Sequence, residues 1–184
     1  MSKLGIRPQQ LTVVQAQELN YVFFDAFYST GKTTLLKHRA EYLHKKKKVV
    51  HYFVHTTAKS TKLPFTMMLE QELRSRPKIR ISETTFQFGK DSIKDFLRGF
   101  SIQPSHHICF DELICHSYTK EFCDALEQMR ENVSSMWIAI GAKPTIAQWL
   151  VAIRSLYKSP DSLFSFLNGT DYVQLDITRI VRNF

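Results

Sequence analysis

The feature that most constrains how this chain can fold is a short apolar run followed closely by a polar turn with one glycine. The run is Tyr21-Val22-Phe23-Phe24, and the turn is Ser29-Thr30-Gly31-Lys32-Thr33-Thr34-Leu35. This order predicts a strand, a tight loop and a helix, in which backbone N–H groups and the positive end of the helix dipole face an anion. The stretch therefore predicts a phosphate-binding loop with a nucleotide as its ligand.

The polar side chains of this loop have roles that follow from their chemistry. Lys32 would neutralise phosphate charge, and Thr33 would offer its hydroxyl to Mg²⁺. The match to G-x-x-x-x-G-K-[ST] is incomplete, because Ala26 stands where the first glycine is usual. A Ser/Thr-rich turn with a solvated lysine is the alternative for this stretch alone. The expected nucleotide-binding residues are Ser29, Thr30, Gly31, Lys32, Thr33 and Thr34.

A second apolar run leads into a pair of acidic residues. His106-His107-Ile108-Cys109-Phe110 is followed by Asp111-Glu112-Leu113-Ile114. A buried strand that ends in an acidic pair is typical of a Walker B motif, in which the first carboxylate holds Mg²⁺ through water and the second acts as base. Asp111 and Glu112 fit those two roles in that order. Such a pair can also face solvent or cap a helix, but two motifs that each follow an apolar run favour a nucleotide site.

Length and composition indicate a soluble intracellular protein of the cytoplasm or nucleus. The 184 residues are 43% hydrophobic and 12% aromatic, which is enough to bury one sizeable core. No stretch approaches the ~18 to 20 apolar residues of a membrane span, and no signal-peptide core stands near the start, so no membrane partner is expected. Cys109, Cys115 and Cys123 form no C-x-x-C pair, which favours reduced thiols.

Positive charge is concentrated in two groups. The chain has 25 Lys plus Arg against 17 Asp plus Glu, a net charge of +8. Such groups attract a DNA or RNA backbone without reading its sequence. A solvated helix end, whose lysines complement the helix dipole, explains the first group equally well. The first group is Lys45-Lys46-Lys47-Lys48 with Lys37 and Arg39 upstream, and the second is Arg74, Arg76, Lys78 and Arg80.

Apolar periodicity predicts strands that alternate with helices. Strands are expected at 21–24, 49–54, 78–82, 106–110, 136–140 and 172–175, and helices at 32–44, 66–74, 91–100, 120–131 and within 145–167. Asp91 is expected to cap the helix that begins there. The alternation predicts an α/β fold with a mainly parallel sheet covered by helices on both faces. Because no repeat or long linker divides the chain, residues 1–184 are expected to form a single domain.

In this order the motifs resemble the first RecA-like lobe of superfamily 1 helicases, and especially the divergent Schlafen-type and UvrD-like P-loop ATPases. The resemblance covers roughly residues 11–183 and rests on the ordered set of motifs. It implies a three-layer RecA-like P-loop NTPase fold with ATP and Mg²⁺ as ligands. It also implies ATP hydrolysis as the activity and nucleic acid as a partner.

The resemblance implies further contacts on both sides of the phosphate loop. Gln15, within Leu11-Thr12-x-x-Gln15, matches the glutamine that touches adenine, and Gln17 is a competing choice. The stretch Val54-His55-Thr56-Thr57 lies where motif Ia would meet a single nucleic-acid strand.

The C-terminal part matches the helicase pattern less closely. Gly141 stands at the start of motif III, where Ala142 and Lys143-Pro144-Thr145 replace the usual Gly-Asp pattern and its glutamine. Arg182 matches the arginine that reaches the γ-phosphate and is therefore the third expected catalytic residue beside Lys32 and Glu112, with Arg179 as runner-up.

The chain ends where the second RecA-like lobe of these motors would begin, so it is expected to be a fragment of a longer protein with that lobe in cis, a truncated gene product, or a domain that borrows the lobe in trans. A lone first lobe is expected to bind ATP and to hydrolyse it slowly, because lobe closure supplies transition-state arginines. A non-catalytic nucleotide-dependent switch or interaction module is the alternative function, and a small P-loop kinase ranks below both.

Overall fold

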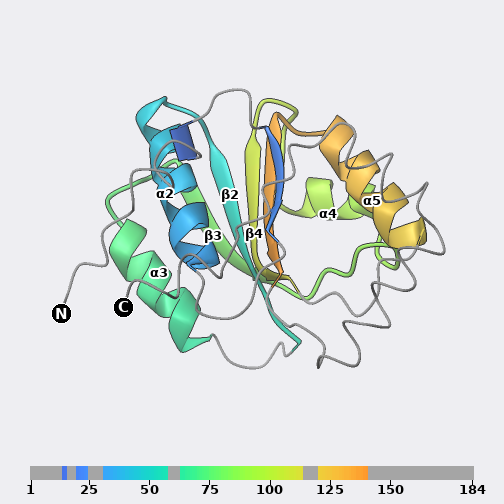
Figure 1. Ribbon diagram of the computed structural model, residues 1–184, viewed down its shortest axis with the longest axis horizontal. Coiled ribbons are helices and arrows are strands. Elements are labelled where there is room, and N and C mark those ends of the chain that lie inside the picture. Colours follow the sequence, from blue (N-terminus) through green and yellow to red (C-terminus); the bar gives the residue numbers. More distant parts are fainter. Residues whose placement is uncertain (1–13, 16–19, 25–30, 58–62, 114–119, 141–184) are drawn as a thin grey trace, which may run out of the picture.

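The computed structural model describes residues 14–15, 20–24, 31–57, 63–113 and 120–140. Within these residues five strands form one parallel sheet in the order β1-β5-β4-β2-β3. Helices α2 and α3 lie on one face of the sheet, and α4 and α5 lie on the other (Figure 1). The predicted three-layer α/β fold is therefore confirmed, and it fits the RecA-like arrangement. The elements are β1 (Tyr21–Phe24), α2 (Lys32–Lys45), β2 (Val50–His55), α3 (Pro64–Leu73), β3 (Ile79–Thr84), α4 (Ile93–Gly99), β4 (His107–Leu113), α5 (Lys120–Glu131) and β5 (Ser135–Ile140).

The two faces of the sheet bury different kinds of side chain. The core beneath α2 and α3 is mainly aliphatic and includes Tyr52 and Trp137. Alternate residues of a strand point to opposite faces, so Phe53 belongs to the core beneath α4 and α5. All residues of β2 are buried, as expected for a central strand covered on both faces. The second core is rich in phenylalanine and contains Phe53, Phe86, Phe88, Phe96, Phe110 and Phe122.

The boundaries of the elements agree closely with those predicted, but the cap of α4 differs. Ser92 is the N-cap, and its Oγ accepts a hydrogen bond from the Asp95 N–H at 3.2 Å. The prediction of Asp91 as the cap was wrong, because its carboxylate accepts from the Gln87 N–H at 2.7 Å and closes the preceding turn. The segments predicted over 145–167 and 172–175 lie outside the described residues. Of the helices that are described, none combines the length and apolarity that crossing a membrane requires.

The order of the strands determines where a ligand can bind. All carboxyl ends of a parallel sheet lie at one edge, and the helices that follow β1 and β4 cover opposite faces of this sheet. In open α/β sheets, ligands bind outside the carboxyl ends where the connections diverge in this way. Since β5 separates β1 from β4, the two strands lie about 10 Å apart. The two predicted motifs can therefore meet only if α2 extends across β5 toward β4.

Candidate functional site

Helix α2 begins at Lys32, directly after Gly31, as the phosphate-loop pattern predicts. Gly31 is the N-cap, with φ of 84° and ψ of 16°, a left-handed conformation that costs a residue with a side chain roughly 1–2 kcal/mol. Its carbonyl accepts a hydrogen bond from the Leu35 N–H at 2.9 Å. The first turn contains no acidic residue, so the positive end of the helix dipole suits an anion. Lys32, at the start of this turn, is buried.

Thr33 and Asp111, the two predicted Mg²⁺ ligands, are in direct contact. The Thr33 Oγ1 donates a hydrogen bond to the Asp111 Oδ1 at 3.1 Å. Asp111 lies in β4 and is 0% exposed. The first turn of α2 therefore reaches the carboxyl end of β4, and the two sequence motifs form one site.

Tyr52, which the sequence analysis did not single out, holds the other oxygen of Asp111. The Tyr52 hydroxyl donates to the Asp111 Oδ2 at 2.7 Å, and both side chains are fully buried. Sequence patterns do not reveal this contact, because it depends on the pairing of β2 with β4. Tyr52 pairs with Cys109, which places Tyr52 diagonal to Asp111 on the same face of the sheet.

Burial sets the ionisation of this pair. It raises the pKa of the Asp111 carboxyl to about 6, and the hydrogen bonds from Tyr52 and Thr33 act in the opposite direction. Burial also raises the pKa of the Tyr52 phenol well above its usual value, and the charge of Asp111 adds to this increase. Tyr52 therefore remains protonated at neutral pH and can continue to donate its hydrogen bond to Asp111.

The oxygen atoms of this pair fit Mg²⁺, which prefers hydroxyl, carboxylate, phosphate and water oxygens. Thr33 and Asp111 would hold the ion, and its charge would offset the burial that raises the pKa of Asp111. The part of the chain that the structure describes contains no group of three or more His, Cys, Asp or Glu side chains that could hold a metal.

A β-bulge in β4 determines where Glu112 points. Phe110 pairs with Ile138 and Leu113 with Ile140, so β4 has one residue more than β5 in this interval. Phe110 and Leu113 both pack into the core beneath α4 and α5. In a regular strand Glu112 would face the same way as Phe110. The extra residue instead turns it out of that core.

Glu112 consequently lies close to the Tyr52–Asp111 pair. Its charge contributes to the raised pKa of both groups, and its side chain is only half-buried. Its φ is 56°, a conformation that is uncommon for residues other than glycine and that occurs at functional sites at a cost of roughly 1–3 kcal/mol. The carboxylate predicted to act as base thus stands next to the carboxylate predicted to hold the metal.

The other predicted site residues are placed less directly. Gln15 is exposed, and the carbonyl of its neighbour Val14 accepts a hydrogen bond from the Arg39 Nη1 at 2.8 Å. Arg39, which holds this neighbour of Gln15, is about two helical turns from Lys32 along α2. The adenine contact of Gln15 therefore stays a prediction. Thr34 is half-buried in the first turn of α2. Ser29, Thr30, Arg182, the alternatives Gln17 and Arg179, and the motif III stretch 141–145 lie outside the described residues.

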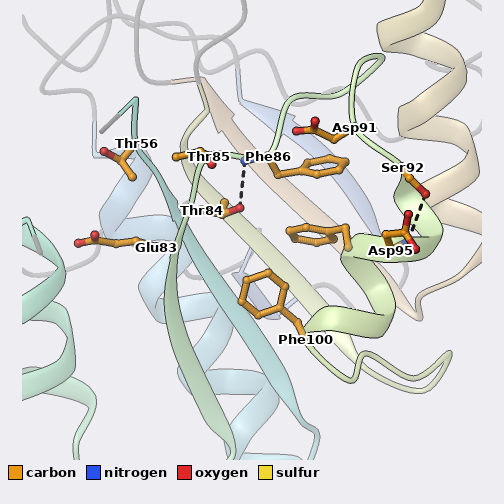
Figure 2. A pocket seen from close by; sticks show the side chains of 10 residues that line it. Thr56, Glu83, Thr84, Thr85, Phe86, Asp91, Ser92, Asp95 and Phe100 are labelled. Atoms are coloured by element: carbon orange, nitrogen blue, oxygen red, sulfur yellow. Dashed lines mark hydrogen bonds between the residues drawn. The ribbon is translucent and has the colours of Figure 1, made fainter. Parts of the chain in front are cut away.

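A separate pocket of about 690 Å³ lies beside the carboxyl ends of β2 and β3, next to α4 (Figure 2). Three phenylalanine rings, Phe86, Phe96 and Phe100, line it. Thr56, from the predicted motif Ia stretch, lines this pocket and is largely buried, and Val54 and His55 are also buried.

The charged side chains that line this pocket are all acidic, Glu83, Asp91 and Asp95. The Glu83 side chain points away from the rings (Figure 2), and its Oε1 accepts from the Leu63 N–H at 2.6 Å. Acidic side chains repel phosphate, so the pocket itself does not suit a nucleic-acid backbone. The motif Ia contact of residues 54–57 stays a prediction.

Comparison with known proteins gives a structural likeness at low sequence identity. No family model matches the sequence, and no curated protein matches it. Among solved structures, the chain is similar to the crystal structure of the Pyrococcus furiosus Hef helicase domain, with 14% identity and a TM-score of 0.48. The match covers 93% of this chain but only 38% of that chain. The class of protein that the structure defines is a three-layer α/β protein in which the first turn of α2 contacts the carboxyl end of β4.

Proposed function

We propose that this chain binds ATP with Mg²⁺ and hydrolyses it slowly, as a helicase-like P-loop domain. The proposal is carried by the 3.1 Å hydrogen bond between the Thr33 Oγ1 and the Asp111 Oδ1. This contact joins two motifs that are far apart in the sequence, one in the first turn of α2 and one in β4. The strand that precedes α2, β1, is not a neighbour of β4 in the sheet. A solvated turn and an unrelated acidic pair would have no reason to meet in a buried site.

Each residue of the site has a distinct role in this reaction. Lys32 and the backbone at Gly31 bind the phosphates, while Thr33 and Asp111 hold Mg²⁺, which when bound withdraws charge from phosphate oxygens. A water molecule attacks the γ-phosphorus in line, and Glu112 accepts its proton. The bond from the γ-phosphorus to the bridging oxygen breaks, and its electron pair leaves with ADP. Gln15, Ser29, Thr30, Thr34 and Arg182 belong to the proposal on the resemblance to helicases alone.

The proposal includes partners that the resemblance suggests. A second RecA-like lobe, in cis or in trans, would supply transition-state arginines and raise the slow rate. A DNA or RNA backbone is the proposed polymeric partner, supported by the net charge of +8. An intracellular setting, cytoplasmic or nuclear, belongs to the same proposal.

Replacing Lys32 by alanine should weaken nucleotide binding. The variant loses the cation at the first turn of α2, so we expect the affinity for a fluorescent ATP analogue with Mg²⁺ to fall at least about tenfold, since an ionic hydrogen bond is worth roughly 1.5–3 kcal/mol. Titration of the analogue measures this change directly. Lys37→Ala is the matched control, because Lys37 lies on the same helix and pairs with Glu72 near the surface. Equal affinities in wild type and Lys32→Ala would contradict the proposal.

Tyr52→Phe should weaken the Mg²⁺-dependent part of nucleotide binding without unfolding the chain. The substitution removes only the hydroxyl that donates to the Asp111 Oδ2. The loss of a hydrogen bond to a charged group costs about 1.5–3 kcal/mol. Nucleotide titrations with and without Mg²⁺, together with urea denaturation, measure the two effects. The half-buried Tyr42 offers the control Tyr42→Phe. If both variants bind the nucleotide half-maximally at the same Mg²⁺ concentration as the wild type, Tyr52 does not position Asp111 for the ion.

A further inference from the structure

Two basic groups that are separate in the sequence meet at the amino ends of β2 and β3. Lys48 precedes β2, Lys78 precedes β3, and these strands are neighbours with Val50 opposite Ile79. The Lys78 Nζ donates a hydrogen bond to the Lys47 carbonyl at 2.8 Å. The Lys78 carbonyl in turn accepts from the Val50 N–H at 2.9 Å. The fold thus joins the two groups into one surface.

We call this the amino-edge surface and define it by side chains that are all exposed. Arg76, although close in sequence, is half-buried, and its Nη2 lies 3.3 Å from a carboxylate oxygen of Glu41, so it is largely neutralised. Within the described residues no carboxylate forms an ion pair with a member of the surface. The surface consists of Lys45, Lys46, Lys47, Lys48, Lys78 and Arg80.

Burial and the positive charge of this surface lower the pKa of two nearby histidines, His106 and His107. Burial lowers the pKa of His106, and the charge of Arg80 lowers it further. For His107, burial and the charges of Arg39 and Lys48 lower the pKa to about 4. These histidines therefore stay neutral near pH 7. The charge of the surface then comes from its lysines and arginine.

We infer that the amino-edge surface binds the phosphate backbone of nucleic acid, as a site separate from the nucleotide site. The amino-edge surface and the nucleotide site lie at opposite ends of the sheet. β2 has six residues and spans roughly 20 Å, so one bound phosphate group cannot contact both places. Several exposed cations without a paired carboxylate suit a polymer that repeats one anionic group and is bound without sequence readout.

The same surface lacks what a membrane would require. Stable membrane binding by a basic patch needs an apolar anchor as well. In the described part of the chain the exposed large hydrophobic residues are Met67 and Met68. Both lie on α3 and precede its last turn, whereas the surface lies at the amino ends of the strands. Nucleic acid is therefore the partner that the charge pattern favours.

The test is fluorescence anisotropy of a labelled 20-nucleotide single strand with the full chain at several salt concentrations. The variant Lys45→Gln, Lys48→Gln, Arg80→Gln removes three charges from the surface. We expect its Kd to rise at least about tenfold and its log–log salt slope to fall by about 2, because each phosphate contact on a single strand contributes about 0.7. Thermal unfolding monitors whether the variant is folded.

The matched control removes three exposed cations elsewhere, with the substitutions Lys90→Gln, Lys94→Gln and Arg98→Gln near α4. Its net charge equals that of the surface variant. An equal loss of affinity in both variants would show that binding depends on net charge alone and would overturn the inference that the amino-edge surface is the binding site. Absence of binding by the wild type would also overturn the inference, as would binding to phosphatidylserine vesicles in place of the oligonucleotide. Because none of these outcomes depends on ATP, a failure of the proposed nucleotide site would be recognised separately by the Lys32→Ala titration.

Discussion

Replacing Glu112 by glutamine should lower the rate of ATP turnover about 10²- to 10⁴-fold while the affinity for ATP stays unchanged. The substitution keeps the size of the side chain and removes the carboxylate that we propose as the acceptor of the proton of the attacking water. The expected effect is this large because a positioned general base contributes about 10²- to 10⁴-fold to a rate, and the charge of Glu112 acts on both Asp111 and Tyr52. Phosphate release at saturating ATP and Mg²⁺ measures turnover, and the fluorescent analogue measures affinity.

A matched control tests whether the effect belongs to this position. Glu131→Gln makes the same chemical change at the exposed end of α5 and should leave both quantities unchanged. Turnover in Glu112→Gln equal to that of wild type would show that another group is the base. If the wild type binds ATP and releases no phosphate, the non-catalytic switch becomes the better description of this domain.

The sequence predicted the fold because its strongest signals are local. Buried central strands appear as uninterrupted apolar runs, and the glycine at position 31 is required by a left-handed conformation at the start of α2. Asp111 and Glu112 could be assigned in order because they follow such a run. These features depend on neighbouring residues and on the period of the secondary structure, which a single sequence records directly.

The contacts that sequence patterns missed are those between distant residues. Tyr52 looks like any other residue of an apolar strand, and only the pairing of β2 with β4 brings it to Asp111. Arg39 was grouped with the basic residues, yet it is 2% exposed and its guanidinium lies 4.6 Å from the centre of the Trp137 ring. The bulge that redirects Glu112 also arises from pairing with β5. Pairing and burial are tertiary properties, so neither periodicity nor composition reveals them.

Phe53→Ala should lower the free energy of unfolding by about 3–5 kcal/mol, the usual cost of truncating a buried phenylalanine. Phe53 is 0% exposed. Its ring centre lies 4.9 Å from that of Phe96, 4.8 Å from that of Phe100 and 5.2 Å from that of Phe110. Since small domains have only about 5–15 kcal/mol of stability, this loss should be visible in urea denaturation followed by circular dichroism. Met67→Ala truncates a side chain that is 57% exposed and should change stability by less than about 0.5 kcal/mol.

The same variant shows whether the two faces of β2 are energetically coupled. Phe53 packs beneath α4 and α5, while the adjacent Tyr52 holds Asp111 on the opposite face. A ligand at 100 times its Kd stabilises the folded state by about 2.7 kcal/mol, so ATP with Mg²⁺ should restore much of the stability that Phe53→Ala loses. Equal ligand stabilisation in wild type and variant would mean that the cavity does not disturb the nucleotide site. A smaller gain in the variant would mean that the position of Tyr52 depends on the packing of Phe53. A stability loss as small as that of Met67→Ala would contradict the central place of Phe53 in this core.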